Sequence, residues 1–369
     1  MNANNLELKK HGIITENEIY EIPQTLNNII KNKQEIIKIA QEIVSRRIKH
    51  IYIIGAGSSY HAGFAMSYMF NRITKIPTFC EFSMEFQYKI QPILKKDDCI
   101  IGMSQSGETQ DTIESIIIAK DKKDCLTIGI TNNNISVLAK SSDYSLSLYC
   151  REEKSILATK TYINQLAVLS ILALEIAKER KTIELVEYNK MFSELDKIPE
   201  LIRESIPSLH NIIKLYSHYF KFAEFCFILG SGPDYATAME ASLKLKEGAR
   251  IFGQAYSTAE FPHGPITLAD SRTWILALIP HEDDKRKRIL ISLLERIKER
   301  KATILGVYET GEKGVIPGPI DIAIQIPNTI MDFQPLIMIL AVQLLTLEIS
   351  RIKGIDCDTP KFLTKVSRI

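Results

Sequence analysis

Two stretches of the sequence recur about 175 residues further along the chain, and this repetition limits the folds that the chain can adopt. Ile51-Tyr-Ile-Ile-Gly-Ala-Gly-Ser-Ser59 resembles Phe227-Ile-Leu-Gly-Ser-Gly-Pro-Asp234, and Gly55 and Gly230 stand 175 residues apart. The segment Thr159 to Arg180 resembles the segment Phe333 to Gly354 at a step of 174. Two landmarks with nearly the same step indicate a duplicated unit. Two unrelated domains with similar apolar runs are the alternative.

Each half alternates short apolar runs with longer amphipathic ones. In the first half we expect strands over 50–55, 78–82, 98–104, 126–131 and 144–149, and helices over 59–73, 109–120 and 159–177. In the second half we expect strands over 224–230, 273–279, 303–308 and 320–326, and helices over 235–252, 284–300 and 333–352. Continuous apolar strands separated by helices indicate parallel sheets covered on both faces. The sequence therefore predicts an α/β fold of two tandem, doubly wound parallel-sheet domains.

The predicted organisation has five parts, and a length of 369 residues fits two domains. We expect a helical lead-in over 1–45, a first domain over 46–180, a helical linker over 181–205, a second domain over 206–354 and a C-terminal tail over 355–369.

Charge and composition exclude several classes of partner. Lys and Arg (46) nearly balance Asp and Glu (44), so the formal charge of +2 argues against binding to nucleic acid or to anionic membranes. The six cysteines are scattered without metal-ligand spacing, which predicts a reducing compartment and no metal site. The first residues lack the apolar segment of a secretion signal, and the apolar run 336–342 is too short to span a membrane. We expect a soluble, cytoplasmic protein without a cofactor.

The loop after the predicted strand 98–104 is rich in small hydrogen-bond donors. Ser104-Gln105-Ser106-Gly107-Glu108-Thr109 leads into a predicted helix, whose N-terminus favours negative charge. Because parallel sheets bind ligands at the carboxyl ends of their strands, Ser104, Gln105, Ser106 and Thr109 are candidate ligands of a phosphate monoester. The alternative is a helix cap made by Ser106 with Thr109 or Glu108.

A second donor-rich loop, Gly55-Ala-Gly-Ser-Ser59, follows the first predicted strand. It lacks the G-x-G-x-x-G pattern, and the chain has no P-loop motif, so a nicotinamide site is not expected. Gly57 and Ser59 are therefore candidate contacts to a phosphate or a sugar. The second half has Ala277-Leu-Ile-Pro280-His-Glu where the loop 104–109 would recur, so we do not expect two equivalent ligands.

Candidate acid–base residues gather in the second half. Lys244 and Glu247 are three residues apart on one face of a predicted helix, either as a stabilising pair on a solvated face or as part of a site closely packed by small neighbours. His263 stands between two prolines in Glu260-Phe-Pro-His-Gly-Pro265 and fits a structural role as well as a functional one. The polar C-terminal tail that carries Lys365 is expected, from its composition and position alone, to be exposed to solvent.

The order of these motifs resembles the sugar isomerase (SIS) domain family, most of all the isomerase half of the glutamine–fructose-6-phosphate amidotransferases. The segments that carry the resemblance are Glu18-Ile-Tyr-Glu-Ile-Pro23, 55–59, 104–109, Thr159-Lys160, Leu243-Lys-Leu-Lys-Glu247, His263-Gly-Pro265 and the tail with Lys365. The resemblance implies two flavodoxin-like SIS domains that act on a hexose 6-phosphate or a hexosamine 6-phosphate.

The resemblance also implies a role for each candidate residue. The phosphate is held by the residues Ser59, Ser104, Gln105, Ser106 and Thr109. Glu247 moves a proton between C1 and C2 of the sugar, with Lys244 orienting the substrate, and Lys365 forms an imine with the C2 carbonyl of the open-chain ketose. His263 opens and closes the sugar ring from the neighbouring subunit, so a homodimer with shared active sites is expected.

Two departures from the family pattern bear on the reaction. No cysteine precedes Cys80, so we do not expect this chain to carry a glutaminase domain. In the loop 153–158, Glu153 matches the family pattern. Ser155 and Ala158 depart from it, because the relatives have smaller residues and a serine in this loop, and this puts the sugar contacts of the loop in doubt.

The expected function is interconversion of glucosamine 6-phosphate with fructose 6-phosphate and ammonia, in the direction of a deaminase. The alternatives are a deglycase for fructosamine 6-phosphates of the fructoselysine type and a plain phosphosugar isomerase. An alternative from a different functional class is a non-catalytic protein that senses phosphosugars.

Overall fold

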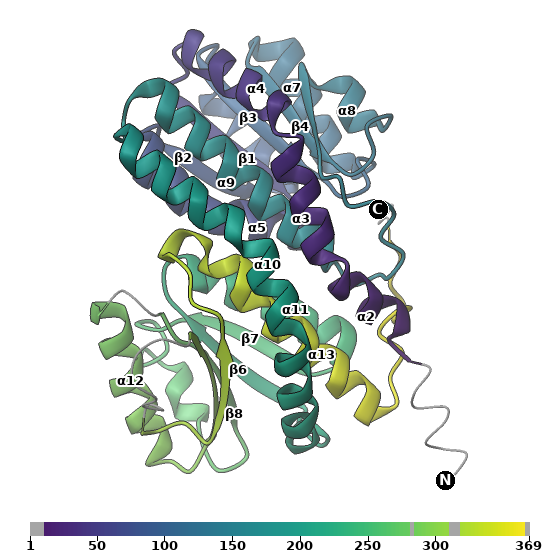
Figure 1. Cartoon of the computed structure of the whole chain (residues 1–369), viewed down its shortest axis with the longest axis vertical. Coiled ribbons are helices and arrows are strands. Elements are labelled where there is room, and N and C mark those ends of the chain that lie inside the picture. The colour runs from purple at the N-terminus through teal and green to yellow at the C-terminus, as the bar shows by residue number, and fades with distance from the viewer. Residues whose placement is uncertain (1–10, 281–283, 310–317, 366–369) are drawn as a thin grey trace. The chain divides into compact units, whose positions relative to one another are not determined.

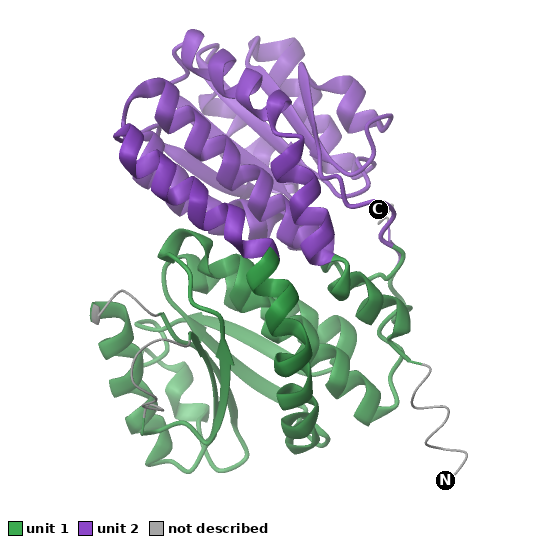
Figure 2. Ribbon diagram, viewed as in Figure 1, with its two compact units in different colours: residues 1–21, 154–159, 200–363 green, residues 22–153, 160–199, 364–369 purple. Residues whose placement is uncertain are grey.

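The structure is a computed structural model that describes residues 11–280, 284–309 and 318–365, and the statements below concern these residues. The chain forms two compact units, each assembled from segments that are distant in the sequence (Figure 2). Unit 1 comprises Met1–Glu21, Lys154–Thr159 and Glu200–Leu363. Unit 2 comprises Ile22–Glu153, Lys160–Pro199 and Thr364–Ile369.

Each unit contains one five-stranded parallel sheet (Figure 1). In unit 2 the strands are β1 (His50–Gly55), β2 (Thr78–Phe82), β3 (Asp98–Met103), β4 (Leu126–Thr131) and β5 (Tyr144–Ser147), in the order β2-β1-β3-β4-β5. In unit 1 they are β6 (Phe225–Gly230), β7 (Phe252–Ser257), β8 (Trp274–Leu278), β9 (Thr303–Glu309) and β10 (Ile322–Ile326), in the order β10-β9-β8-β6-β7. Taken from β7 to β10, the second order repeats the first, as a duplicated unit requires.

Helices cover both faces of the sheet in unit 2. They are α3 (Ile22–Lys31), α4 (Gln34–Ser45), α5 (Ser58–Met69), α6 (Phe86–Lys89), α7 (Gln110–Lys123), α8 (Val137–Ser141) and α9 (Lys160–Arg180), with short turns η1 (Phe70–Thr74), η2 (Ser83–Glu85) and η3 (Gln91–Ile93). On one face Gly63 of α5 packs against Ile53, and on the other Gly102 of β3 packs against Ile116 of α7. The predicted doubly wound α/β architecture is therefore confirmed.

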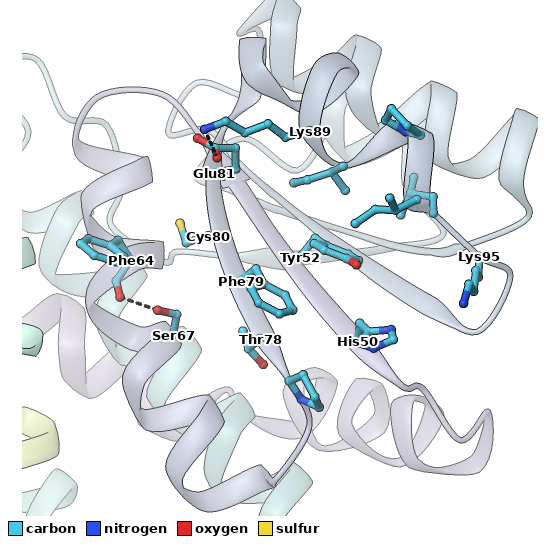
Figure 3. Close-up of a pocket in the computed structure, with 15 residues that line it drawn as sticks. His50, Tyr52, Phe64, Ser67, Thr78, Phe79, Cys80, Glu81, Lys89 and Lys95 are labelled. Carbon is cyan, nitrogen blue, oxygen red and sulfur yellow. Dashed lines mark hydrogen bonds and ion pairs between the residues drawn. The ribbon is translucent and has the colours of Figure 1, made fainter.

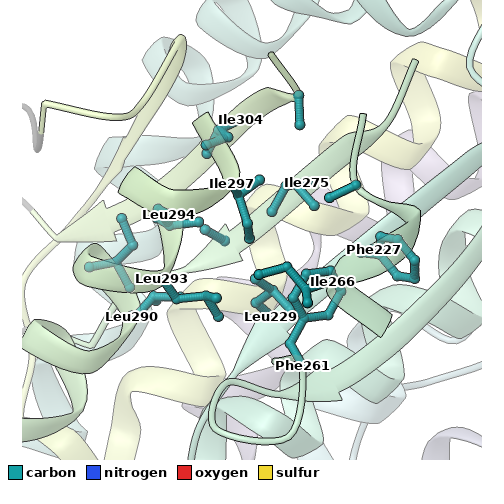
Figure 4. Packing of buried hydrophobic residues seen from close by; sticks show 14 residues of the cluster. Phe227, Leu229, Phe261, Ile266, Ile275, Leu290, Leu293, Leu294, Ile297 and Ile304 are labelled. Atoms are coloured by element: carbon teal, nitrogen blue, oxygen red, sulfur yellow. The ribbon is translucent and has the colours of Figure 1, made fainter. Parts of the chain in front are cut away.

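Unit 1 has the same layers. Its helices are α2 (Ile13–Tyr20), α11 (Pro233–Ala249), α12 (Asp284–Lys298) and α13 (Gln334–Lys353), with short turns η4 (Ser217–Phe220), η5 (Pro265–Leu268) and η6 (Met331–Phe333). The helix α10 (Leu185–Tyr216) belongs partly to each unit. Leu290, Leu294 and Ile297 of α12 pack with Phe227 of β6 and with Phe261 in one apolar cluster (Figure 4).

One strand of unit 1 differs from the sequence prediction. The predicted helix 235–252 ends at Ala249, because Arg250 adopts a left-handed conformation with φ 50°, and Phe252 then begins β7. This strand lies at the edge of the sheet and pairs only with β6 among the described strands. Since only part of Phe252–Ser257 is buried, the segment lacks the continuous apolar run on which the other strands were predicted.

The segment Met331–Lys353 is long and apolar enough to cross a membrane. However, 89% of its most apolar stretch is buried within the protein, as expected for a core helix. It therefore gives no support for a membrane span.

We predict that Phe261→Ala lowers the free energy of unfolding by about 3–5 kcal/mol, because Phe261 is fully buried and packs edge-on against Phe227. Phe222, which is 86% exposed, supplies the matched control, and Phe222→Ala is expected to change the stability by less than about 0.5 kcal/mol. Urea denaturation of both variants measures the difference. Equal losses would show that Phe261 does not belong to a tightly packed core.

Candidate active site

The loop between β3 and α7 in unit 2 gathers three hydroxyl groups. Ser104 Oγ lies 2.8 Å from Thr109 Oγ1 and 3.4 Å from Ser106 Oγ. Ser104 Oγ also accepts a hydrogen bond from the backbone N–H of Gly107, and Ser106 Oγ accepts one from Glu108. Thr109 is the N-cap residue of α7 but its side chain makes no capping bond. The hydroxyls therefore lie together at the N-terminus of the helix, as a phosphate site requires.

Gly107 is required for the shape of this loop. Its φ is +70°, and a Cβ atom at this position would clash with Ser136 and Thr131. The main chain of Gln105 is fixed as well, because its carbonyl oxygen accepts a bond from the N–H of Asn132. The neighbouring loop after β4 thus supports the loop 104–109.

The second predicted donor loop lies at the same edge of the sheet. Gly55, the last residue of β1, pairs in register with Met103, the last residue of β3, so both loops leave the carboxyl ends of neighbouring strands. Gly57 has φ 52° and is the N-cap residue of α5. Ser59 is buried in the first turn of α5, and its Oγ accepts a 2.8 Å bond from Nε2 of Gln165 in α9.

Gln165 is a residue that the sequence analysis missed. It is buried and its amide is directed to Ser59, at the same edge as the predicted ligands. The signal in the sequence was a polar pair, Asn164-Gln165, inside an otherwise apolar helix. Such a pair needs hydrogen-bond partners when it is buried, and this points to a polar neighbour.

Glu153 and Lys365, both in unit 2, form an ion pair. Lys365 Nζ lies 2.8 Å from Glu153 Oε2, although the two residues are 212 positions apart. Glu153 also accepts bonds from the backbone N–H and the hydroxyl of Thr161, in the first turn of α9. The structure thus places the tail lysine on a buried carboxylate. Thr159, in unit 1, is buried, and its carbonyl oxygen accepts a bond from Gln343.

In unit 1, Lys244 lies between two carboxylates of α11. Its Nζ is 2.6 Å from Glu247 Oε2 and 3.5 Å from Glu240 Oε1. The side chains of Lys244 and Glu240 are 1% and 0% exposed, whereas that of Glu247 is 19% exposed. This excludes a pair on a fully solvated face. The carboxylate of Glu247 is bonded to the buried ammonium of Lys244 but is itself partly exposed, so it is suited to exchange protons with a bound molecule.

His263 stands apart from this pair. It is exposed and lies in the turn that follows β7, whereas Lys244 and Glu247 lie on α11. Its backbone N–H bonds to the carbonyl of Glu260, and the following Gly264 has φ 134° and open space around it. The turn therefore presents His263 at the surface.

The second half contains a modified version of the first donor loop. Gly232 caps α11 with φ 62° and ψ −134°, close to the values of 52° and −128° at Gly57. Asp234 lies 175 residues after Ser59 and is therefore its equivalent in the second copy of the repeat. Its carboxylate is buried and lies 3.1 Å from Arg286 of α12, which also donates to the carbonyl of Ser231. An internal ion pair therefore occupies the position at which the first half has neutral donors.

A hollow of about 1060 Å³ in unit 2 lies elsewhere (Figure 3). Its walls include Tyr52 of β1 and Phe79 of β2, which stack at 5.7 Å, and Glu81 and Lys89, which form an ion pair. None of the predicted site residues lines it. It extends along two strands and a covering segment rather than over the loops at the carboxyl ends.

The fold agrees with comparisons to known proteins. The model of the SIS domain matches residues 46–175 and again residues 223–350. The chain therefore belongs to the SIS domain family.

Similar proteins include glutamine–fructose-6-phosphate aminotransferases. The enzyme of Clostridium tetani is 33% identical over 356 residues, which cover 94% of this chain and 57% of the relative. The enzyme of Thermotoga maritima is 34% identical over 357 residues, with the same coverage. This chain thus spans little more than half the length of the curated relatives that it matches.

Two solved structures match nearly from end to end. The C-terminal domain of glucosamine-fructose-6-phosphate aminotransferase from Francisella tularensis has a TM-score of 0.88 and 29% identity, covering 95% of this chain and 99% of that one. A glucosamine-6-phosphate deaminase from Thermotoga maritima has a TM-score of 0.74 and 25% identity, covering 96% and 99%.

We predict that Asp234 makes the stability of the protein depend on pH. Burial raises the pKa of this carboxyl to about 7, from 3.8 for an exposed group, although Arg286 opposes the shift. The folded protein therefore binds a proton that the unfolded chain releases between about pH 4 and pH 7. The contribution of Asp234 to the free energy of unfolding falls as the pH rises through this window, by at most about 1.4 kcal/mol per pH unit, and is constant above it.

Asp234→Asn is expected to remove the pH-dependent contribution of Asp234 to the free energy of unfolding, because the amide does not titrate. Urea denaturation between pH 4.5 and pH 8 measures the slope, with the exposed Asp196→Asn as a control that keeps the wild-type profile. A slope that is the same in Asp234→Asn and in the wild type would contradict the assignment.

Proposed function

We propose that this chain is an aminosugar-phosphate isomerase that converts glucosamine 6-phosphate and water into fructose 6-phosphate and ammonia, and catalyses the reverse reaction. The observation that carries the proposal is Glu247, a partly exposed carboxylate held by the buried ammonium of Lys244. The similarity to fructose-6-phosphate aminotransferases and to a glucosamine-6-phosphate deaminase supports it. A cytoplasmic homodimer is part of the proposal.

The phosphate is assigned to the carboxyl edge of the sheet in unit 2. The hydroxyl of Ser104 already lies within hydrogen-bond distance of the hydroxyls of Ser106 and Thr109. Gln105, Ser59 and the N-terminus at Gly57 supply further donors. Hydroxyls and backbone N–H groups at the start of a helix hold a phosphate without needing a lysine or an arginine.

Proton transfer is assigned to Glu247. In the open-chain aldose, Glu247 removes the proton from C2 and returns it to C1, so that the enolamine becomes a ketose imine, and water then releases ammonia from C2. Lys244 fixes the direction of the carboxylate through its 2.6 Å bond. Because Lys244 is itself buried between Glu240 and Glu247, it has little freedom to turn elsewhere.

Lys365 and His263 complete the assignment. Lys365 condenses with the C2 carbonyl of fructose 6-phosphate in the reverse reaction, with loss of water. Ammonia then displaces the lysine, and the ammonia-derived imine is the electron sink for the proton transfer; in the forward reaction, water releases ammonia through the same lysine imine. Glu153 and Thr159 are assigned to the segment beside the sugar. His263 opens the sugar ring in the active site of a neighbouring subunit, and its exposed position is compatible with this role.

We predict that Ser104→Ala and Thr109→Ala each weaken substrate binding by about 1–3 kcal/mol, a roughly 5- to 150-fold rise in KM. Each substitution removes a hydroxyl that bonds to a charged group. Steady-state kinetics with glucosamine 6-phosphate measures the effect, and the exposed Ser208→Ala serves as the control. Unchanged KM values in both variants would refute the phosphate assignment.

We predict that Glu247→Gln lowers kcat about 10²- to 10⁴-fold, because the amide has the same shape but does not accept the proton. Ammonia release from glucosamine 6-phosphate measures the rate, and Glu204→Gln, an exposed carboxylate on α10, is the control. Wild-type protein that releases no more ammonia than Glu247→Gln would remove the basis for the proposal.

The same assay separates the alternatives. Fructose 6-phosphate with ammonium, and fructoselysine 6-phosphate, are offered in parallel, and the products are identified by mass. Release of lysine would indicate a deglycase, and isomerisation without exchange of nitrogen a plain phosphosugar isomerase. Binding without turnover of any substrate would indicate a sensor.

A further inference from the structure

The helix α2 is capped by a residue from the other end of the chain. Its own N-cap residue, Gly12, has no side chain to offer. Asp358 supplies the missing acceptor: its Oδ2 accepts a 3.1 Å bond from the N–H of Ile14, and its Oδ1 a 2.8 Å bond from the N–H of Thr15. The hydroxyl of Thr15 donates to the same Oδ1 at 2.7 Å. A carboxylate at a helix N-terminus is stabilised by the helix dipole, so this is a firm attachment for the tail.

The same helix holds the segment 154–159. Thr15 Oγ1 lies 2.7 Å from Ser155 Oγ. One turn along α2, the carboxylate of Glu18 accepts bonds from the backbone N–H groups of Lys154 and Ser155. The N–H of Ile156 in turn donates to the carbonyl of Asp358 at 3.0 Å. The segment 154–159 and the tail are therefore bonded both to α2 and to each other.

These contacts are deeply buried. Thr15 and Ser155 have no exposed surface, and Glu18 and Asp358 are 4% and 6% exposed. Hydrogen bonds to a charged group in such a place are stronger than those in water, and breaking one leaves a buried polar group without a partner. We name the four residues Thr15, Glu18, Ser155 and Asp358 the α2 clamp.

The α2 clamp adjoins the Glu153–Lys365 pair along the chain. Ser155 follows Glu153 by two residues, and Asp358 precedes Lys365 by seven. A tail fixed only at the end of α13, at Lys353, would leave twelve residues up to Lys365 and a reach of up to about 40 Å, whereas a tail fixed at Asp358 leaves seven residues and a reach of up to about 25 Å. Asp358 fixes the tail, and Ser155 fixes the start of the segment 154–159, which follows Glu153. These two attachments limit the positions that the Lys365 amine can adopt.

We propose that Thr15 and Asp358 are positioning residues that hold the C-terminal tail so that Lys365 attacks the sugar carbonyl. This inference rests on the proposed function, in which Lys365 forms the imine. It also gives a role to the segment 18–23, for which the sequence analysis had none. Neither residue touches the substrate; each acts through the chain that leads to the lysine. Correct placement of a reacting group contributes much of an enzyme's rate, and a displacement of about 1 Å costs up to about 100-fold.

Thr15→Val tests the inference, because it keeps the shape of the side chain and removes the hydroxyl contacts to Ser155, Asp358 and Cys357. Thr74→Val is the matched control: Thr74 is fully buried in unit 2, and its hydroxyl bonds to the carbonyl of Phe70 and the N–H of Ile76. The imine formed between Lys365 and fructose 6-phosphate is reduced with borohydride, which supplies the hydride, and the modified peptide is quantified over time. Melting temperature, KM and kcat are measured for each variant, and Asp358→Asn replaces Thr15→Val if the latter does not fold.

We expect trapping of Lys365 and kcat to fall about 10- to 100-fold in Thr15→Val, with KM within about twofold of the wild type. Exchange of the Ile156 amide hydrogen is expected to accelerate as well, because its acceptor is the carbonyl of Asp358. Thr74→Val is expected to lower the melting temperature and leave trapping unchanged.

If wild-type and Thr15→Val protein trap the sugar equally fast, the positioning role is wrong while the proposed function stands. If both valine variants lose trapping in proportion to melting temperature, the effect is structural only and the inference fails. If wild-type protein forms no adduct at Lys365, the imine assignment fails and the positioning role fails with it.

Discussion

The turn from the first strand of each sheet into the following helix is the constraint on which the rest of the structure depends. Gly57 and Gly232 adopt positive φ values of 52° and 62° there, a region that other residues rarely occupy. Gly55 and Gly230, two residues earlier, face the backbone of the helix so closely that a Cβ atom would be strained or would clash. These glycines bring the N-termini of α5 and α11 to the carboxyl edge of the sheets. The positive ends of both helix dipoles thereby lie at the edge where parallel sheets bind ligands.

The same turn has a different chemical outcome in each half. In unit 2 a neutral pair, Ser59 and Gln165, lies at the positive end of α5. In unit 1 the carboxyl group of Asp234, whose pKa is raised by burial to about 7, lies beside Arg286 at the N-terminus of α11. A phosphate would have to compete with that carboxylate. Under the proposed function, the duplicated fold therefore keeps one anion site and leaves α11 to carry Glu240, Lys244 and Glu247.

The sequence predicted what depends on local patterns and missed what depends on distant contacts. The apolar runs and the repeat located nine of the ten strands, because parallel strands are buried on both faces. The strand β7 was missed since Phe252–Ser257 is an edge strand with an incomplete apolar pattern. The loop 104–109 and the spacing of Lys244 and Glu247 were visible because their members are neighbours in the chain. Three contacts join residues that are 106 to 344 positions apart: Gln165 with Ser59, Glu153 with Lys365, and Asp358 with the start of α2. A periodic pattern in the sequence cannot predict contacts between such distant residues.

The distribution of charge explains why a nearly neutral chain suits a phosphorylated substrate. The loop 104–109 contains no lysine or arginine, whereas the lysines assigned to the chemistry are each held by carboxylates: Lys244 by Glu240 and Glu247, Lys365 by Glu153. A phosphate dianion near an unpaired lysine would form an ion pair with it, and the sugar would then be held in the wrong register. Carboxylate partners reduce that attraction, so under the proposed function the hydroxyls and backbone N–H groups of unit 2 determine where the phosphate lies.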